Sequence, residues 1–156
     1  MVNKDEKASF QIARRVRELR EGAGLSQDGL ARLLPSHRSL VSQVERAANN
    51  LSVDTIQRFA IALGVDAVSL LRKGPPIACD PNDRRSLRER ISQNVFSIRT
   101  AKGLPQEGLS ESAGLSRNYV ATLEVHKKNV ALDHLEKLAL GLGVPISTLF
   151  EPNRQD

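Results

Sequence analysis

The apolar residues of this chain recur at helical spacing, and the same pattern appears twice. Ile12, Val16 and Leu19 lie three and four residues apart, and a matching stripe returns 79 positions later. This spacing places apolar side chains on one face of an α-helix. Each stripe is followed by a glycine, Gly24 or Gly103, a residue typical of the position just past a helix C-terminus. The pattern therefore predicts a first helix in each half of the chain.

Four shorter helices are predicted to follow in each half. The second begins at Ser26, a favoured N-cap residue, or at Pro105, a favoured first-turn residue. The third is expected over about residues 38–46 and 117–125. The fourth has apolar residues at helical spacing, and a short fifth helix follows the sequence Leu-Gly-Val in both halves. An all-α fold is predicted.

The two halves are copies of one unit. Residues 10–71 align with residues 89–150 without a gap, and 18 of the 62 aligned positions are identical. A unit of this length suits a small independent domain, and the period is too long for a solenoid repeat. The segment 73–86, KGPPIACDPNDRRS, has the proline-rich composition of a semi-rigid linker. We therefore expect one domain over 9–72 and a second over 87–151.

The second and third predicted helices are joined by only a few residues in each unit. Two short helices joined so tightly form a helix-turn-helix, whose second helix enters the DNA major groove. In the second unit Gly114 is expected to adopt the left-handed conformation, and Ser116 to cap the third helix. Pro35 stands at the glycine position of the first unit, so its turn is expected to differ. There, Ser36 or His37 is expected to begin the next helix.

The outward face of the third helix carries side chains able to bond base edges. At about 100° per residue, Leu40, Val41 and Val44 share the inner side. The outer side carries Arg38, Ser39, Ser42, Gln43 and Arg46 in the first unit, and Arg117, Asn118, Ala121, Thr122 and Val125 in the second. Any exposed helix has a polar outer face, but this one lacks an acid before Glu45. Arginine suits guanine, glutamine and asparagine suit adenine, and apolar groups suit thymine methyls, so the face favours DNA.

Residues 25–64 (LSQDGLARLL…) and 104–143 (LPQEGLSESA…) resemble the XRE (Cro/cI-type) helix-turn-helix family. The shared landmarks, at fixed spacing in both units, are Gln27 and Gln106, Glu45 and Glu124, Asn50 and Asn129, and the closing Leu-Gly-Val. The resemblance implies two tandem, five-helix, lambda-repressor-like domains.

The resemblance also implies roles for individual residues. Base readers would be Arg38, Ser39, Ser42, Gln43, Arg117, Asn118 and Thr122. Phosphate contacts would come from Gln27, Arg46, Gln106, Lys127 and Lys128. Arg20 with Glu45, and Arg99 with Glu124, resemble buried ion pairs between the first and third helices, so neither arginine is expected to read bases.

The second unit departs further from the family pattern than the first. The usual glycine after the third helix is Ala47 in one unit and His126 in the other, and Val125 replaces a typical arginine. Residues 1–74 carry 12 basic and 8 acidic side chains, a net of +4, whereas residues 75–156 carry 11 and 10, a net of +1. The basic surface expected for a polyanionic partner therefore lies mainly in the first unit.

These features predict a sequence-specific regulator of transcription, a repressor, that binds a double-stranded DNA operator through its recognition helices. In the alternative, one unit binds DNA while the other, with the C-terminal unit the better candidate, serves dimerisation or binds a partner protein, as in an antitoxin-like regulator. Two modes of binding are consistent with the sequence: a homodimer on a palindromic operator, and a monomer whose two units bind a direct or inverted repeat.

Other classes of function are disfavoured. His37, His126 and His134 lack ligand spacing with one another or with Cys79, so no metal, cofactor or enzymatic activity is expected. No run approaches the roughly 20 apolar residues of a membrane span, no helix pairs a basic face with a broad apolar one, and the first residues lack a secretion signal. A cytoplasmic, nucleoid-associated location is expected.

A glycine inside the second predicted helix of each unit is not explained by helix propensity. Gly29 and Gly108 lie inside the second predicted helix of each unit, where alanine would stabilise the helix by about 1 kcal/mol. Our hypothesis is that a side chain at these positions would collide with the DNA backbone or with a neighbouring helix.

Overall fold

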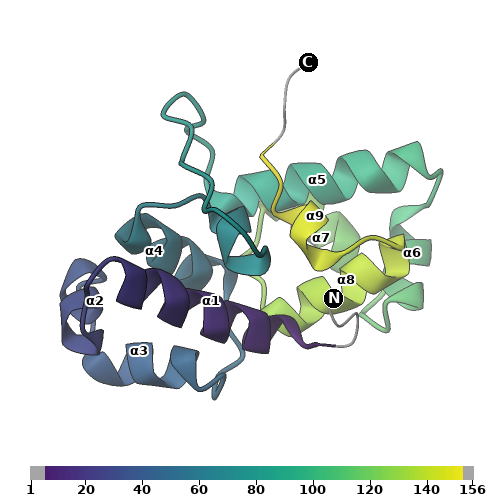
Figure 1. Ribbon diagram of the computed structural model, residues 1–156. Helices are drawn as coiled ribbons and strands as arrows, with labels where there is room; N and C mark the ends of the chain where they lie inside the picture. The colour runs from purple at the N-terminus through teal and green to yellow at the C-terminus, as the bar shows by residue number, and fades with distance from the viewer. Residues whose placement is uncertain (1–5, 153–156) are drawn as a thin grey trace. The chain divides into compact units, whose positions relative to one another are not determined.

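The computed structural model describes residues 6–152, which form two compact all-helical units divided between Asp83 and Arg84 (Figure 1). The N-terminal unit contains α1 (Ala8–Gly22), α2 (Gln27–Leu33), α3 (Arg38–Glu45), α4 (Val53–Leu63) and the 3₁₀ helix η1 (Ala67–Leu71). The C-terminal unit contains α5 (Leu87–Ala101), α6 (Gln106–Ser112), α7 (Tyr119–His126), α8 (Leu132–Leu142) and α9 (Ile146–Leu149). The prediction of an all-α fold with five helices in each unit is confirmed. The limits 9–72 and 87–151 stay predictions.

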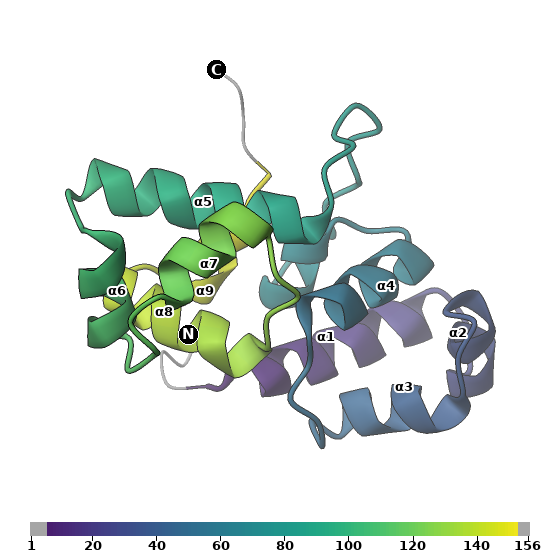
Figure 2. The ribbon, with the colours of Figure 1, turned by 180° about the vertical axis from the view of Figure 1, so that it is seen from behind.

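Each unit buries the apolar face that its sequence predicted. In the N-terminal unit α1 packs against α3, α4 and η1, and α2 packs against α3 and α4 (Figure 2). Ile12 and Val16 are fully buried, and Leu19 is half-buried. In the C-terminal unit α5 packs against α7 and α9, and α6 packs against α7 and α8. Among the described residues, no helix is long and apolar enough to cross a membrane.

The helix ends follow local sequence chemistry. Gly24 and Gly103 have φ of 71° and 67° just past α1 and α5, as predicted. The hydroxyl of Ser26 accepts the N–H of Gly29 at 2.9 Å and so caps α2. Pro105 is extended, with ψ 154°, and occupies the N-cap of α6 rather than its first helical position. A proline at the N-cap offers no side-chain acceptor, so α6 begins without the cap that Ser26 gives α2.

The turn between α2 and α3 has one hydrogen bond in common with its counterpart and differs from it at Pro35, as predicted. The N–H of Ser36 donates to the carbonyl of Ala31 at 2.9 Å, and the N–H of Leu115 donates to that of Ser110 at 2.9 Å. Gly114, at φ 70° as predicted, makes one further N–H bond that Pro35 cannot make because proline lacks the donor. The turns also differ in backbone conformation, since φ is 25° at Pro35 and 70° at Gly114, and His37 is the N-cap of α3.

The third helix of the C-terminal unit begins later than predicted. α3 begins at Arg38, but α7 begins at Tyr119, two residues past the aligned position, so Arg117 and Asn118 lie in the preceding turn. The expected cap at Ser116 is wrong, because Asn118 is the N-cap residue and makes no side-chain capping bond.

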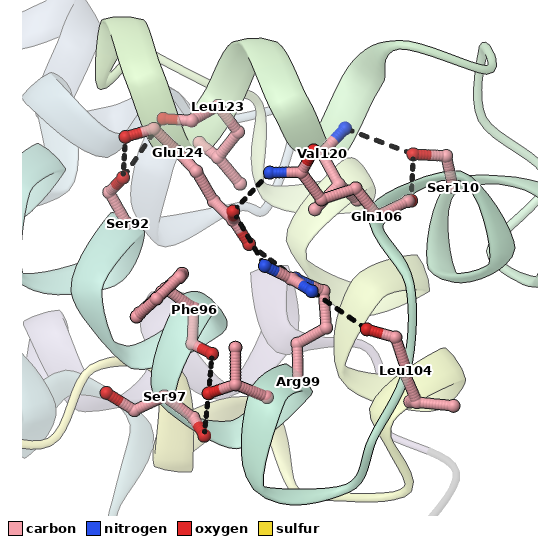
Figure 3. Close-up of polar contacts among 11 residues, drawn as sticks. Ser92, Phe96, Ser97, Arg99, Leu104, Gln106, Ser110, Val120, Leu123 and Glu124 are labelled. Atoms are coloured by element: carbon pink, nitrogen blue, oxygen red, sulfur yellow. Dashed lines mark hydrogen bonds and ion pairs between the residues drawn. The ribbon is translucent and has the colours of Figure 1, made fainter.

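Two serines of the C-terminal unit hydrogen-bond to the backbone of α7 and have no equivalent in the N-terminal unit. The hydroxyl of Ser110 accepts the N–H of Val120 at 3.1 Å, and that of Ser92 donates to the carbonyls of Leu123 and Glu124 at 3.0 and 3.2 Å (Figure 3). These bonds supply partners near both ends of α7. Alanine stands at both aligned positions of the N-terminal unit, Ala13 and Ala31, so α3 lacks them.

The start of the proline-rich segment is bonded to the N-terminal unit. The N–H of Ile77 donates to the hydroxyl of Ser69 at 2.8 Å, and the N–H of Asp66 donates to the carbonyl of Ile77 at 2.8 Å. The guanidinium of Arg15 donates to the carbonyls of Ser69 and Gly74. Residues 74–77 therefore fold back over η1.

Candidate nucleic-acid interface

A buried ion pair joins α1 to α3. Nε of Arg20 donates to Oε1 of Glu45 at 2.7 Å, and the two side chains are only 9% and 3% exposed. Nη1 of the same arginine donates to the carbonyl of Leu25 at 2.8 Å, at the entry to α2. Buried charges of this kind need a partner and further hydrogen bonds to offset their desolvation. The predicted ion pair is present, and Arg20 is unavailable for reading bases.

The predicted phosphate ligand Gln27 belongs to the same cluster. Its Nε2 donates to Oε2 of Glu45 at 2.7 Å, which ties the first residue of α2 to the last residue of α3. A primary amide has two N–H groups, so one remains for another acceptor. Gln27 therefore fixes the placement of α2 against α3, and its contact with phosphate stays a prediction.

The C-terminal unit repeats this cluster (Figure 3). Arg99 donates from Nε and Nη2 to the two oxygens of Glu124, at 2.7 and 3.0 Å, and from Nη1 to the carbonyl of Leu104 at 2.8 Å. Nε2 of Gln106 donates to Oε2 of Glu124 at 2.7 Å. The two helices of the motif are thus held by the same three residue types in both units.

An arginine lies exposed at the start of the third-helix region in each unit, facing an acid on the second helix. Nη1 of Arg38 lies 3.8 Å from Oδ2 of Asp28, and its Nε donates to Oε1 of Gln27 at 3.4 Å. Nη2 of Arg117 donates to Oε2 of Glu107 at 3.1 Å. The hydrogen bond to Glu107 raises the pKa of Arg117 above its ordinary value. The sequence prediction missed both acids, although each follows the landmark glutamine.

The other base readers predicted in the N-terminal unit lie along α3. Ser39 is exposed, and Ser42 and Gln43 are half-buried. Oε1 of Gln43 accepts a hydrogen bond from Nδ2 of Asn49 at 2.7 Å. Nε of Arg46, the predicted phosphate ligand, donates to the carbonyl of Ser42 at 3.3 Å.

The predicted site of the C-terminal unit is less regular. Arg117 and Asn118 are exposed but precede α7, and Thr122 is half-buried with its hydroxyl donating to the carbonyl of Asn118 at 2.8 Å. Lys127 and Lys128 are exposed just past the end of α7. The structure therefore spreads these residues over a turn, a helix and a helix end.

Val125 is exposed on α7, between Thr122 and Lys127 in the sequence. Its side chain is 68% exposed, at the position aligned with Arg46 of the N-terminal unit. The position offers no charge to a phosphate. It offers apolar surface instead.

A tyrosine that the sequence prediction did not single out fixes the start of α7. The hydroxyl of Tyr119 lies 3.0 Å from Nδ1 of His134 on α8, and the two rings meet edge to face at 5.2 Å. Burial, followed by the charge of Asp133, raises the pKa of Tyr119 to about 12. The aligned residues of the N-terminal unit are Leu40 and Thr55, so this contact belongs to the C-terminal unit alone.

The unexplained glycines lie beside the start of their own helix. A Cβ at Gly29 would lie 3.3 Å from Oγ of Ser26 and 3.5 Å from Cδ2 of Leu25, and one at Gly108 would lie 3.0 Å from Cγ of Pro105. The predicted collision with a neighbouring helix is wrong, because these neighbours precede the same helix. The collision with DNA stays a prediction.

Comparison with known proteins agrees with this architecture. A family model described as a helix-turn-helix domain matches residues 11–72, and a second, described as helix-turn-helix, matches residues 96–149. A hypothetical transcription factor of Neisseria meningitidis serogroup B is 37% identical over 73 residues, which are 47% of this chain and 69% of that protein. The control protein C.MunI of Mycoplasma sp is 35% identical over 65 residues, 41% of this chain and 88% of that protein.

Two further matches cover a smaller share of the relative or have a lower structural similarity. The immunity repressor protein of Bacillus phage phi105 is 37% identical over 59 residues, 38% of this chain and 41% of that protein. The crystal structure of the hypothetical transcription factor NHTF from Neisseria covers 53% of this chain and 92% of its own, at 35% identity and a TM-score of 0.43. The matched models and relatives assign the chain to the XRE (Cro/cI-type) helix-turn-helix family: it is a DNA-binding transcriptional regulator with two such domains in tandem.

Proposed function

We propose that the chain is a sequence-specific repressor whose two units each place the third helix, with the turn before it, in a major groove of one operator. The observation that carries this proposal is the repeated arginine–glutamate–glutamine cluster. In both units it fixes the second helix against the third and leaves Arg38 or Arg117 exposed at the junction. We assign repression as the regulatory outcome for two reasons. One relative is named an immunity repressor protein, and a protein bound to an operator blocks other proteins from that DNA.

The N-terminal unit makes the stronger contacts in this proposal. Arg38 reads guanine, while Ser39, Ser42 and Gln43 read the neighbouring bases from α3. The bond from Asn49 holds the amide of Gln43 in one orientation. Gln27 and Arg46 contact phosphates on either side of the groove. The net charge of +4 over residues 1–74 supports this assignment, because phosphate neutralisation dominates affinity.

The C-terminal unit reads a different half-site. Arg117 and Asn118 approach the bases from the turn and Thr122 from α7, with Gln106, Lys127 and Lys128 on the phosphates. Because the reading residues differ between the units, a single chain would recognise an operator without two-fold symmetry. A homodimer would instead bind an operator that contains each half-site twice, related by two-fold symmetry.

A second candidate role for the C-terminal unit rests on its exposed apolar side chains. Val125 is 68% exposed on α7, and Phe96 is 51% exposed on α5. Both units expose large apolar side chains, but in the C-terminal unit one of them, Val125, replaces the predicted phosphate ligand Arg46, which suits contact with a protein, either a second copy of this chain or a different partner. In this alternative the N-terminal unit alone reads DNA. The proposed setting in both cases is the nucleoid of the cytoplasm, with no catalytic step.

Selection of binding sites from a pool of random duplexes tests the proposal. The full chain is expected to enrich one sequence, and Arg38→Ala is expected to weaken binding to it by about 10- to 100-fold, the range for a lost bidentate base contact. Arg17→Ala, an exposed arginine of α1, is the control. Enrichment of no sequence would contradict the proposal. If Arg117→Ala and Asn118→Ala both leave affinity and preference unchanged, the C-terminal unit has the alternative role.

A further inference from the structure

Asp28 and Glu107 occupy the same place in the two units. Each is the second residue of its helix, α2 or α6, and directly follows the glutamine of the buried cluster. Each faces the arginine predicted to read DNA, at 3.8 Å for Asp28 and Arg38 and at 3.1 Å for Glu107 and Arg117. Only 18 of 62 aligned positions are identical between the units, yet an acid and its facing arginine are kept in both.

The contribution of these ion pairs to the folding stability is too small to explain their presence in both units. The side chains of Arg38 and Asp28 are 65% and 55% exposed, and those of Arg117 and Glu107 are 72% and 58% exposed. Ion pairs this exposed contribute little to folding, because water screens the charges and two long side chains lose freedom. An acid in the first turn does complement the helix dipole, but the dipole does not require an arginine opposite it.

The position of the acids has a consequence at a DNA surface. A carboxylate beside a reading arginine lies close to the phosphates whenever the helix enters the groove, and the repulsion opposes binding to any duplex. A guanine at the right position offsets this cost, because the arginine donates two hydrogen bonds to its O6 and N7. On a duplex without that guanine these two hydrogen bonds are absent, and the repulsion between the carboxylate and the phosphates is not offset.

We infer that Asp28 and Glu107 are specificity-determining positioning residues. They hold the guanidinium groups of Arg38 and Arg117 toward the base edges, and they penalise binding to duplexes that lack the matching base. Discrimination of this kind combines an attractive contact to the target with a repulsive element against competitors. The inference rests on the proposed function, because it requires that the two arginines read DNA.

The test compares Asp28→Asn and Glu107→Gln in the full chain, on the duplex selected by the unsubstituted chain and on a random-sequence duplex. Each substitution removes the repulsion from both duplexes, but on the selected duplex it also removes the group that holds the reading arginine in place, and the two effects offset each other there. Affinity for the random duplex is therefore expected to rise by about 3- to 10-fold and affinity for the selected duplex to stay within about twofold, so the specificity ratio falls. The plot of log affinity for the random duplex against log salt is expected to steepen. Circular dichroism melting verifies that each variant is folded.

Glu21→Gln is the matched control. It removes the same charge from an exposed ion pair, that of Glu21 with Arg17 at 3.4 Å on α1, with side chains 61% and 63% exposed. The same carboxylate lies 3.7 Å from Nη2 of Arg20, which keeps its 2.7 Å ion pair with Glu45 in this variant. We expect it to leave the specificity ratio unchanged. In a chain already carrying Arg38→Ala, Asp28→Asn is expected to change the ratio no further, because its effect acts through that arginine.

The outcomes separate the inference from the function on which it rests. If the unsubstituted chain selects no sequence, both are overturned. If it selects a sequence and Arg38→Ala weakens binding, but Asp28→Asn and Glu107→Gln behave like Glu21→Gln, the reading function holds and the role of the acids is overturned. A fall of the ratio in the Arg38→Ala background also contradicts a role exerted through that arginine.

Discussion

Gln106 and Glu124 are joined by a 2.7 Å hydrogen bond from Nε2 to Oε2, and the same carboxylate receives Arg99 at 2.7 Å. The bond connects the first residue of α6 to α7, while the arginine comes from α5. One buried carboxylate thus sets the relative placement of three helices. Because the N-terminal unit repeats the arrangement through Glu45, the clusters are the structural basis of both proposed reading surfaces.

The first prediction concerns the loss of that carboxylate. Glu124→Ala leaves the buried guanidinium of Arg99 without its ion pair, and we expect the free energy of unfolding of the C-terminal unit to fall by about 3–5 kcal/mol. Tyr119 is the only tyrosine and tryptophan is absent, so tyrosine fluorescence in a urea titration reports on this unit. The control is Glu111→Ala on the exposed face of α6. A loss for Glu124→Ala no larger than that of the control would contradict the structural role of the cluster.

The second prediction concerns the residue after α3. Ala47 has φ 53°, in the left-handed region, at the position where the family usually has glycine. A non-glycine residue there is strained by about 1–2 kcal/mol, so we expect Ala47→Gly to stabilise the N-terminal unit by about 1 kcal/mol. Ala48→Gly, at the next position and without a positive φ, is expected to be neutral or destabilising. Thermal melting compares the two variants, and equal effects would count against the strain.

The third prediction concerns the pH dependence of stability. Burial raises the pKa of Tyr119 to about 12, whereas an unfolded tyrosine ionises near 10. Stability from this group is fully present below about pH 10 and is lost as the pH rises toward 12, because the unfolded chain ionises first. Tyrosinate absorbance should show a midpoint near 12 in the folded protein and near 10 in urea. Coincident midpoints would contradict the burial of the hydroxyl, and Tyr119→Phe should remove this contribution to the pH dependence.

The fourth prediction concerns the docked start of the proline-rich segment. Ser69→Ala removes the acceptor of the Ile77 N–H, and we expect a loss of about 1–2 kcal/mol with faster amide exchange at Ile77. Ser36→Ala in the turn before α3 is the control in the same unit. If exchange at Ile77 is equally fast in both variants, the segment is not held by this bond.

The sequence predicted those parts of the structure that depend on local chemistry. The apolar stripe through Ile12 and Val16 specifies α1, and the glycine at Gly24 specifies its end. The family landmarks also led to the ion pair between Arg20 and Glu45.

The parts that sequence reasoning missed depend on contacts across the fold. The late start of α7 is accompanied by a hydrogen bond from the N–H of Val120 to the hydroxyl of Ser110, ten residues away. The hydrogen bond between Arg117 and Glu107 also joins residues ten positions apart, on either side of the turn. Neither contact leaves a periodic signal in the sequence, because each depends on how two helices pack.

Methylation interference on the selected operator tests the central claim, that both units read bases in the major groove, most directly. We predict that methylation at N7 of guanine interferes with binding at two separate clusters, since N7 lies in the major groove. Arg38→Ala should abolish the interference at one cluster and Arg117→Ala at the other, with Arg17→Ala changing neither. A single cluster that responds only to Arg38→Ala would contradict the two-reader account, and interference that neither substitution alters would contradict the assignment of the reading residues.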